Sequence, residues 1–202
     1  MPVRTPISAQ LARRGRRHFL RLAGVVLGAA LVVTPVFAKP PGLRLWSPGI
    51  KGPNLGMDQV FNGMGCTGKN ISPELRWSGV PAGTKSFAVT VYDPDAPTGS
   101  GWWHWVVYNI PATAVAIPAG AGAAAGGGLP AGTVQGVTDF GVPGFGGACP
   151  PKGDKPHRYV FTLYALRVAK LDVPATATAA MVGFNLHANS IAKAMFTAHY
   201  GQ

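Results

Sequence analysis

Glycine and proline recur so often along this chain that they limit which regular elements it can form. The 202 residues include 28 glycines and 19 prolines, and the apolar runs between them are short. Short apolar runs bounded by turn residues are typical of strands, because a helix needs a longer uninterrupted segment. The sequence therefore predicts a mainly β domain, and we expect two antiparallel sheets packed as a β-sandwich.

Six segments have the pattern of strands, and three of them are clear. The clear candidates are residues 85–92, 103–110 and 157–168, and the weaker ones are 43–46, 76–77 and 133–138. Residues 119–132, "AGAGAAAGGGLPAG", consist almost entirely of small residues and predict a loop on the surface.

A helical pattern occurs only late in the chain, from Thr176 to about Met195. Gly183 and Asn185 interrupt it, so we expect short C-terminal helices rather than one long helix. The last segment, "FTAHYG", is a candidate for a returning strand.

The first 38 residues have the features of an export signal. They contain six of the 18 lysine and arginine residues and no acidic residue, then an apolar stretch, and they end in "VFA". We expect cleavage after Ala38, which leaves residues 39–202 as a single periplasmic or secreted domain. Arg16 and Arg17 with the following "HFL" resemble a twin-arginine signal. The alternative is an N-terminal anchor, although the stretch is shorter than the about 20 apolar residues of a membrane span.

The net charge of +11 does not indicate a nucleic-acid-binding protein. After residue 38, 12 basic residues remain against 7 acidic ones, and they are scattered singly. Nucleic-acid binding requires a concentrated basic patch. We therefore expect no nucleic-acid partner, and no stable membrane insertion after the signal is cleaved.

Cys66 and Cys149 are the two cysteines of the chain. In an exported protein such a pair predicts one disulfide, with two separate buried thiols as the alternative. A free Cys149 beside His157 and Asp93 would have the composition of a nucleophile, a base and an orienting carboxylate. A disulfide would remove that nucleophile, so hydrolysis is kept only as an alternative.

Each clear strand places one polar residue near the end of an apolar face, if side chains alternate regularly. The predicted faces are His104 with Trp102, Val106, Tyr108 and Ile110; His157 with Tyr159, Phe161, Leu163 and Ala165; and Asp93 with Phe87, Val89 and Val91. If these strand ends are neighbours, Asp93, His104 and His157 converge in a small pocket at the rim of the sandwich. Structural histidines, or a metal site of two histidines and one carboxylate, are the alternatives.

Two long motifs carry a resemblance to a known family. "VYDPDAPTGSGWWHWVVYNIP" and "GGACPPKGDKPHRYVFTLYAL" resemble the phosphatidylethanolamine-binding protein family, specifically its bacterial Raf-kinase-inhibitor-like branch. "NISPELRWSGVPAGTKSFAVTVYD" resembles the segment that precedes the aspartate motif in that branch. The resemblance extends from about Leu43 to the C-terminus, which is almost the whole predicted mature chain.

The resemblance implies a β-sandwich with a small anion pocket near one edge. By motif, the ligand-binding candidates are Asp93, Asp95, Trp102, His104, Cys149, His157 and Tyr159. In the family these groups surround phosphate, acetate or a similar anion, and the "ACPPKG" loop, residues 148–153, is expected to add backbone N–H donors. Cys149 stands where the commonest eukaryotic pattern has glycine, and this places a sulfur at the pocket mouth. Asp95 has a local alternative, an Asx-turn with the backbone.

We therefore expect an exported protein that binds a small anionic or phosphorylated ligand, without a cofactor, a metal or catalysis. A carboxylate beside imidazoles favours their protonated form, so anion binding should weaken as the pH rises through the histidine range. The alternatives are a surface-mediated inhibitor of a kinase or protease with a vestigial pocket, and the Cys/His hydrolase. "DFG" at residues 139–141 lacks every other kinase element and is taken as a coincidence.

Overall fold

The computed structural model describes residues 42–174 and 176–202, which belong to one compact unit, Lys39–Gln202. The predicted export signal, residues 1–38, lies outside the described residues. Within the described part of the chain, no helix has the length and apolarity to cross a membrane. The elements are β1 (Arg44–Trp46), β2 (Asn62–Gly63), β3 (Cys66–Thr67), β4 (Leu75–Ser78), β5 (Ser86–Asp93), β6 (Trp102–Pro111), β7 (Ala116–Ile117), β8 (Val134–Gln135), β9 (His157–Leu166), α1 (Ala179–Asn189) and β10 (Ser190–Tyr200).

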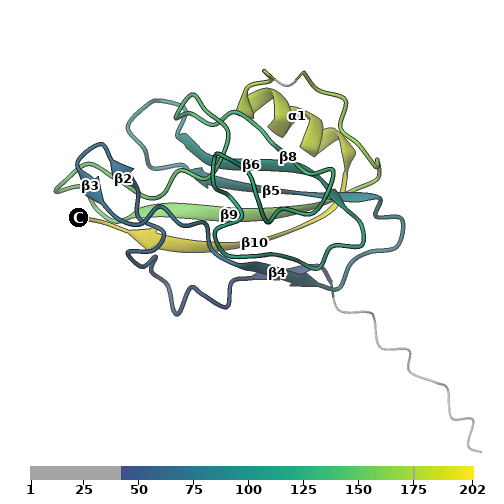
Figure 1. Cartoon of the computed structure of the whole chain (residues 1–202), viewed down its shortest axis with the longest axis horizontal. Coiled ribbons are helices and arrows are strands. Elements are labelled where there is room, and N and C mark those ends of the chain that lie inside the picture. The colour runs from purple at the N-terminus through teal and green to yellow at the C-terminus, as the bar shows by residue number, and fades with distance from the viewer. Residues whose placement is uncertain (1–41, 175) are drawn as a thin grey trace, which may run out of the picture. The chain divides into compact units, whose positions relative to one another are not determined.

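The strands form two packed antiparallel sheets and a short hairpin, as Figure 1 shows. The larger sheet has the order β10-β9-β5-β6-β8, the smaller one β1-β4-β7, and β2 pairs with β3. Side chains from the facing sides of the two sheets, including Trp77, Phe87 and Phe161, make the main core. Helix α1 covers the other face of the larger sheet through Val182 and Leu186. The predicted mainly β sandwich is therefore confirmed.

Burial on both faces explains why the central strand is easy to recognise in the sequence. In β5, "SFAVTVYD", every residue except Tyr92 is buried. A strand covered by a sheet on one side and a helix on the other needs apolar residues at nearly every position. The other two clear candidates also occur as strands, β6 and β9.

The prediction of short helices between Thr176 and Met195 is wrong in two respects, because one helix runs through Gly183 and Asn185 without a break and the second half of the segment is a strand. One helix, α1, begins after Thr178, whose Oγ accepts the N–H of Met181, and it ends at Asn189. The chain then turns at Ser190 into β10, which pairs with β9 along its whole length. The alanines of this segment favour a helix locally, but an available strand edge decides the conformation of such a sequence.

Two β-bulges in β6 change which side chains face the core. Val91 pairs with Trp105 and Tyr92 with Trp103, so His104 is an extra residue with no partner opposite. A second irregularity surrounds Asn109, whose backbone is left-handed with a φ of 59°. Each bulge reverses the alternation of the side chains that follow it.

The regular alternation predicted for residues 102–110 is therefore wrong. Val106 and Tyr108 pack beneath α1, whereas Ile110 lies in the core between the sheets. The ring of His104 also lies on the inter-sheet side, with its centroid 5.1 Å from that of Tyr159. The bulge at His104 is what turns this histidine toward the residues of β9.

Candidate functional site

A cavity of about 190 Å³ opens where β5 ends and where β6 and β9 begin. We call it the rim pocket. Six of the seven predicted ligand-binding residues line it, namely Asp93, Trp102, His104, Cys149, His157 and Tyr159. The remaining wall includes Pro150 and Pro151 of the expected "ACPPKG" loop, and residues that the sequence did not single out, among them Met64, Thr98 and Phe140. The predicted convergence of three strand ends therefore occurs in the structure.

Asp93 and His157 form a buried pair at the base of the rim pocket. His157 Nδ1–H donates to Asp93 Oδ2 at 2.8 Å, and both side chains are at most 5% exposed. Asp93 Oδ1 accepts the backbone N–H of Asp95 at 2.8 Å, so the Asx-turn belongs to Asp93 rather than to Asp95. On the other side of the ring, His157 Nε2 lies 3.5 Å from the half-exposed carboxylate of Asp154. These contacts hold the imidazole in one orientation.

His104 is held by a backbone carbonyl. Its Nδ1 lies 2.8 Å from the Gly146 oxygen, and because a carbonyl can only accept, Nδ1 carries the hydrogen. Burial lowers the pKa of His104, and this outweighs the Gly146 carbonyl and the charge of Asp93, which raise it. The expectation that the carboxylate keeps both imidazoles protonated is therefore wrong for His104. In the neutral ring, Nε2 is a hydrogen-bond acceptor.

Tyr159 is 1% exposed, and its hydroxyl has no hydrogen-bond partner among the described residues. Burial, followed by the charge of Asp93, raises the pKa of Tyr159, so the hydroxyl stays neutral. The backbone N–H of Cys149 lowers that pKa by pointing at the oxygen, but an N–H cannot accept the hydroxyl hydrogen. Leaving a buried polar group unsatisfied costs about 1–3 kcal/mol. One residue of the rim pocket wall thus carries a buried hydroxyl donor without an acceptor.

Asp95 does not line the rim pocket. Its carboxylate accepts Arg158 Nε and Nη2 at 2.9 and 2.7 Å, and also the backbone N–H of Arg158 at 2.8 Å. The hydrogen bonds from the guanidinium are the main reason that the pKa of Asp95 falls to about 2. Asp95 therefore ties the "DPDAP" turn to the start of β9, beside the site rather than inside it.

Asp95→Asn should destabilise the protein at neutral pH and not at very low pH. The pair is partly solvent-screened, so we expect a loss of at most about 1 kcal/mol in the free energy of unfolding at pH 7. Because the pKa is depressed in the folded state, this stabilisation is complete above the ordinary value of 3.8 and is lost as the pH falls through about 2. Urea unfolding at pH 7 and pH 2 tests this, and an equal loss at both pH values would contradict it.

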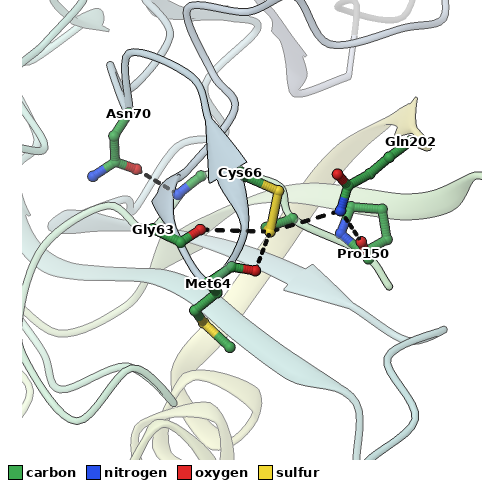
Figure 2. Close-up of a disulfide and its surroundings, with 8 residues drawn as sticks. Gly63, Met64, Cys66, Asn70, Pro150 and Gln202 are labelled. Carbon is green, nitrogen blue, oxygen red and sulfur yellow. Dashed lines mark hydrogen bonds between the residues drawn. A yellow bond between two sulfur atoms is a disulfide. The ribbon is translucent and has the colours of Figure 1, made fainter. Parts of the chain in front are cut away.

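A disulfide joins the loop that carries Cys149 to the β2–β3 hairpin. Cys66 and Cys149 are bonded with their Cα atoms 5.9 Å apart (Figure 2). The Cys149 sulfur also lies 3.5 Å from the Met64 carbonyl oxygen, a contact and not a hydrogen bond, since a bonded sulfur has no hydrogen to donate. Cys149 in this state cannot act as a thiolate nucleophile, which removes the basis of the Cys/His hydrolase.

Three residues of the "ACPPKG" loop have no free backbone N–H to offer the rim pocket. The Ala148 N–H donates to the Gln59 carbonyl at 3.0 Å, and Pro150 and Pro151 have no N–H. The preceding Gly147 N–H donates to Asn70 Oδ1 at 2.6 Å. The two prolines therefore contribute apolar wall to the rim pocket.

Within residues 42–174 and 176–202, no cluster of three or more His, Cys, Asp or Glu side chains has the geometry to hold a metal ion.

Phe140 is the most informative residue of the rim pocket that the sequence did not single out. It belongs to "DFG", and Asp139 Oδ2 accepts the Trp103 N–H at 2.7 Å, which docks this turn beside the start of β6. Nothing in the local pattern indicates that contact, which joins residues 36 positions apart.

Comparisons with known proteins agree on one family. The model of that family, described as phosphatidylethanolamine-binding protein, matches residues 51–201. YbcL of Escherichia coli is 54% identical over 177 residues, which cover 87% of this chain and 97% of YbcL. YbhB of the same organism is 56% identical over 149 residues, 74% of this chain and 93% of YbhB.

Solved structures give the same result. The crystal structure of YbcL, described as a new member of the mammalian PEBP family, has a TM-score of 0.78 and 57% identity over 80% of this chain and 99% of that chain. A PEBP homologue from Chlamydia trachomatis has a TM-score of 0.65 and 30% identity over 80% of this chain and 98% of that chain.

Proposed function

The chain belongs to the phosphatidylethanolamine-binding protein family, and we propose from this premise that its rim pocket binds a small phosphorylated ligand without catalysis. The observation that carries the proposal is the hydroxyl of Tyr159. It is a buried donor without an acceptor, and it belongs to a residue that lines a cavity together with His104 and His157. A ligand oxygen at that position would satisfy it.

The charges around the rim pocket favour a singly charged ligand. The carboxylate of Asp93 is buried against His157, and Asp154 lies on the other side of that ring. A neutral His104 offers an acceptor at Nε2, which can receive the P–O–H hydrogen of a phosphate monoanion. The same ligand offers oxygens to the Tyr159 hydroxyl. A phosphate monoester in its monoanionic form therefore matches both groups better than a dianion does.

Binding to this site should weaken as the pH rises. A phosphate monoester loses its second proton with a pKa of about 6, and the monoanion then disappears. Because burial lowers the pKa of His104, protonation of that ring can replace the lost hydrogen only at low pH. Sulfate has no proton to donate near neutrality, so it should bind more weakly than phosphate at the same pH.

Calorimetric titration of the purified protein with inorganic phosphate, phosphoethanolamine and sulfate at pH 6 tests the proposal. We expect both phosphates to bind more tightly than sulfate, and Tyr159→Phe to lower phosphate affinity roughly tenfold, the value of about one hydrogen bond to a charged group. Stability should not fall in Tyr159→Phe, because the substitution removes an unsatisfied hydroxyl.

Tyr164→Phe is the matched control, since Tyr164 lies on the same strand but does not line the rim pocket. Equal phosphate affinity in Tyr159→Phe and in the wild type would contradict the assignment of the hydroxyl. If neither phosphate binds the intact protein, the surface-mediated inhibitor of a kinase or protease becomes the better hypothesis.

We also propose that the protein works in an oxidising compartment, the periplasm or the extracellular space. The disulfide between Cys66 and Cys149 supports this, because such bonds persist mainly outside the reducing cytoplasm. Fractionation of expressing cells, with the protein recovered in the cytoplasm with both thiols free, would overturn it.

A further inference from the structure

A second cavity adjoins the rim pocket, and one residue belongs to the walls of both. The second cavity has a volume of about 220 Å³ and is lined by residues of the 140–146 segment together with Phe61, Asn70, Ala124 and Thr138. Phe140 lines this cavity and the rim pocket alike. Its ring therefore stands between the two spaces.

Aromatic neighbours and a glycine hold the ring of Phe140 in this position. Its centroid lies 4.7 Å from that of Phe61, 5.4 Å from Trp102 and 5.5 Å from His104. The ring also rests directly on Gly146, where an added Cβ would come within 2.1 Å of Phe140 Cε2. The Gly146 carbonyl also accepts the His104 Nδ1–H. The backbone of Gly146 therefore positions both the ring of Phe140 and the imidazole of His104.

The second cavity offers no free polar side chain among those that line it. Asn70 Nδ2 donates to the Phe145 carbonyl at 3.2 Å, and Asn70 Oδ1 accepts the Gly147 N–H. Thr138 Oγ1 donates to the Val142 carbonyl at 2.9 Å. The rest of the lining is mostly apolar, including Phe61 and Phe145. This space suits an apolar group and not a second charged one.

We propose that Phe140 sets the ligand size of the rim pocket by excluding the apolar substituent of a phosphate ester from the second cavity. The protein then favours compact phosphorylated ligands, because a large aryl group gains no buried contact behind the ring. This inference rests on the proposed phosphate site and names the residue that limits what the site accepts. Shortening Phe140 would join the two cavities.

The test compares methyl phosphate with 1-naphthyl phosphate by calorimetry in the wild type, Phe140→Ala and Phe140→Leu. In the wild type, the naphthyl ester should bind no more tightly than the methyl ester. In Phe140→Ala, the ratio of naphthyl to methyl affinity should rise roughly tenfold or more, because the ring system becomes buried in the joined cavity. Phe140→Leu, which retains apolar volume, should fold even if the alanine variant does not, and should give an intermediate ratio.

Two further variants test whether the second cavity is the cause of the change in the affinity ratio. Phe184→Ala removes a phenylalanine that is 75% exposed on α1 and should leave the ratio at the wild-type value. Ala124→Leu in the Phe140→Ala background refills the second cavity and should return the ratio toward that of the wild type.

The outcomes distinguish this inference from the function on which it rests. If methyl phosphate does not bind the wild type, the proposed function fails. If it binds but the affinity ratio is the same in the wild type and both Phe140 variants, the size-selecting role is wrong and the function stands. A wild type that already prefers the naphthyl ester by tenfold would also overturn the role of Phe140.

Discussion

Replacing Cys66 and Cys149 together by alanine should lower the free energy of unfolding by about 4 kcal/mol. The two cysteines are 83 residues apart, and a cross-link that closes so long a loop removes much of the conformational freedom of the unfolded chain. Urea unfolding of the oxidised wild type and of the double variant measures the difference. Phosphate affinity should also fall, because the Cys149 loop that lines the rim pocket loses its tie to the β2–β3 hairpin.

The wild type kept in a dithiol reductant is the matched control for the double variant. It should unfold at the same urea concentration as the variant, because both lack the cross-link. Thiol titration of the unfolded, unreduced wild type should find no free thiol. Two free thiols, or a loss below about 1 kcal/mol against the usual range of about 2–5, would show that the bond does not stabilise this fold.

Gly147→Ala should cost about 3 kcal/mol or more, at the upper end of what overpacking usually costs. A Cβ on Gly147 would lie 2.4 Å from the Gln59 oxygen and 2.6 Å from the Phe61 nitrogen, which are backbone atoms that cannot rotate away. The same two residues exchange backbone hydrogen bonds with Ala148. Making room for the methyl group therefore separates the loop of the rim pocket from the 59–61 segment. Thermal or urea unfolding gives the size of the loss.

Gly56→Ala is the control for Gly147→Ala. The nearest atom to an added Cβ there is the flexible Gln59 Oε1 at 3.8 Å, and the backbone is not left-handed. We expect a change within about 0.5 kcal/mol in either direction. If the two alanine variants were equally stable, the contact between the loop and the 59–61 segment would not constrain the fold as described.

The strands that the sequence predicts best are those in which burial constrains the residue type at nearly every position. Strand β5 is covered on both faces, and β9 alternates from His157 onward as expected, so that their apolar patterns are complete. The sequence predicts the end of strand β10, "FTAHYG", as a returning strand, but the alanine-rich first half has good helical propensity and was assigned to a helix. Its conformation depends on the free edge of β9, which is contributed by residues more than 20 positions earlier.

The candidate site was also predictable only in part. The motifs placed Asp93, His104, His157 and Tyr159 together, and the structure has all four on the wall of one cavity. The alternation argument reached the right convergence for His104 through a wrong face assignment, since a bulge and not regular alternation turns its ring. The protonation of His104 could not be inferred from a neighbouring carboxylate, because burial has the larger effect on its pKa.

The fold class, the family and the residues that meet at the rim of the sandwich can all be inferred from the order of the residues alone. Those properties follow from local patterns of apolar residues and from long motifs, which are contained in the order of the residues. Three features became visible only in the folded chain: Asp95 pairs with Arg158, the hydroxyl of Tyr159 lacks an acceptor, and Phe140 lies between two cavities. These depend on which distant segments approach one another, and on how completely they exclude water, which no local pattern specifies.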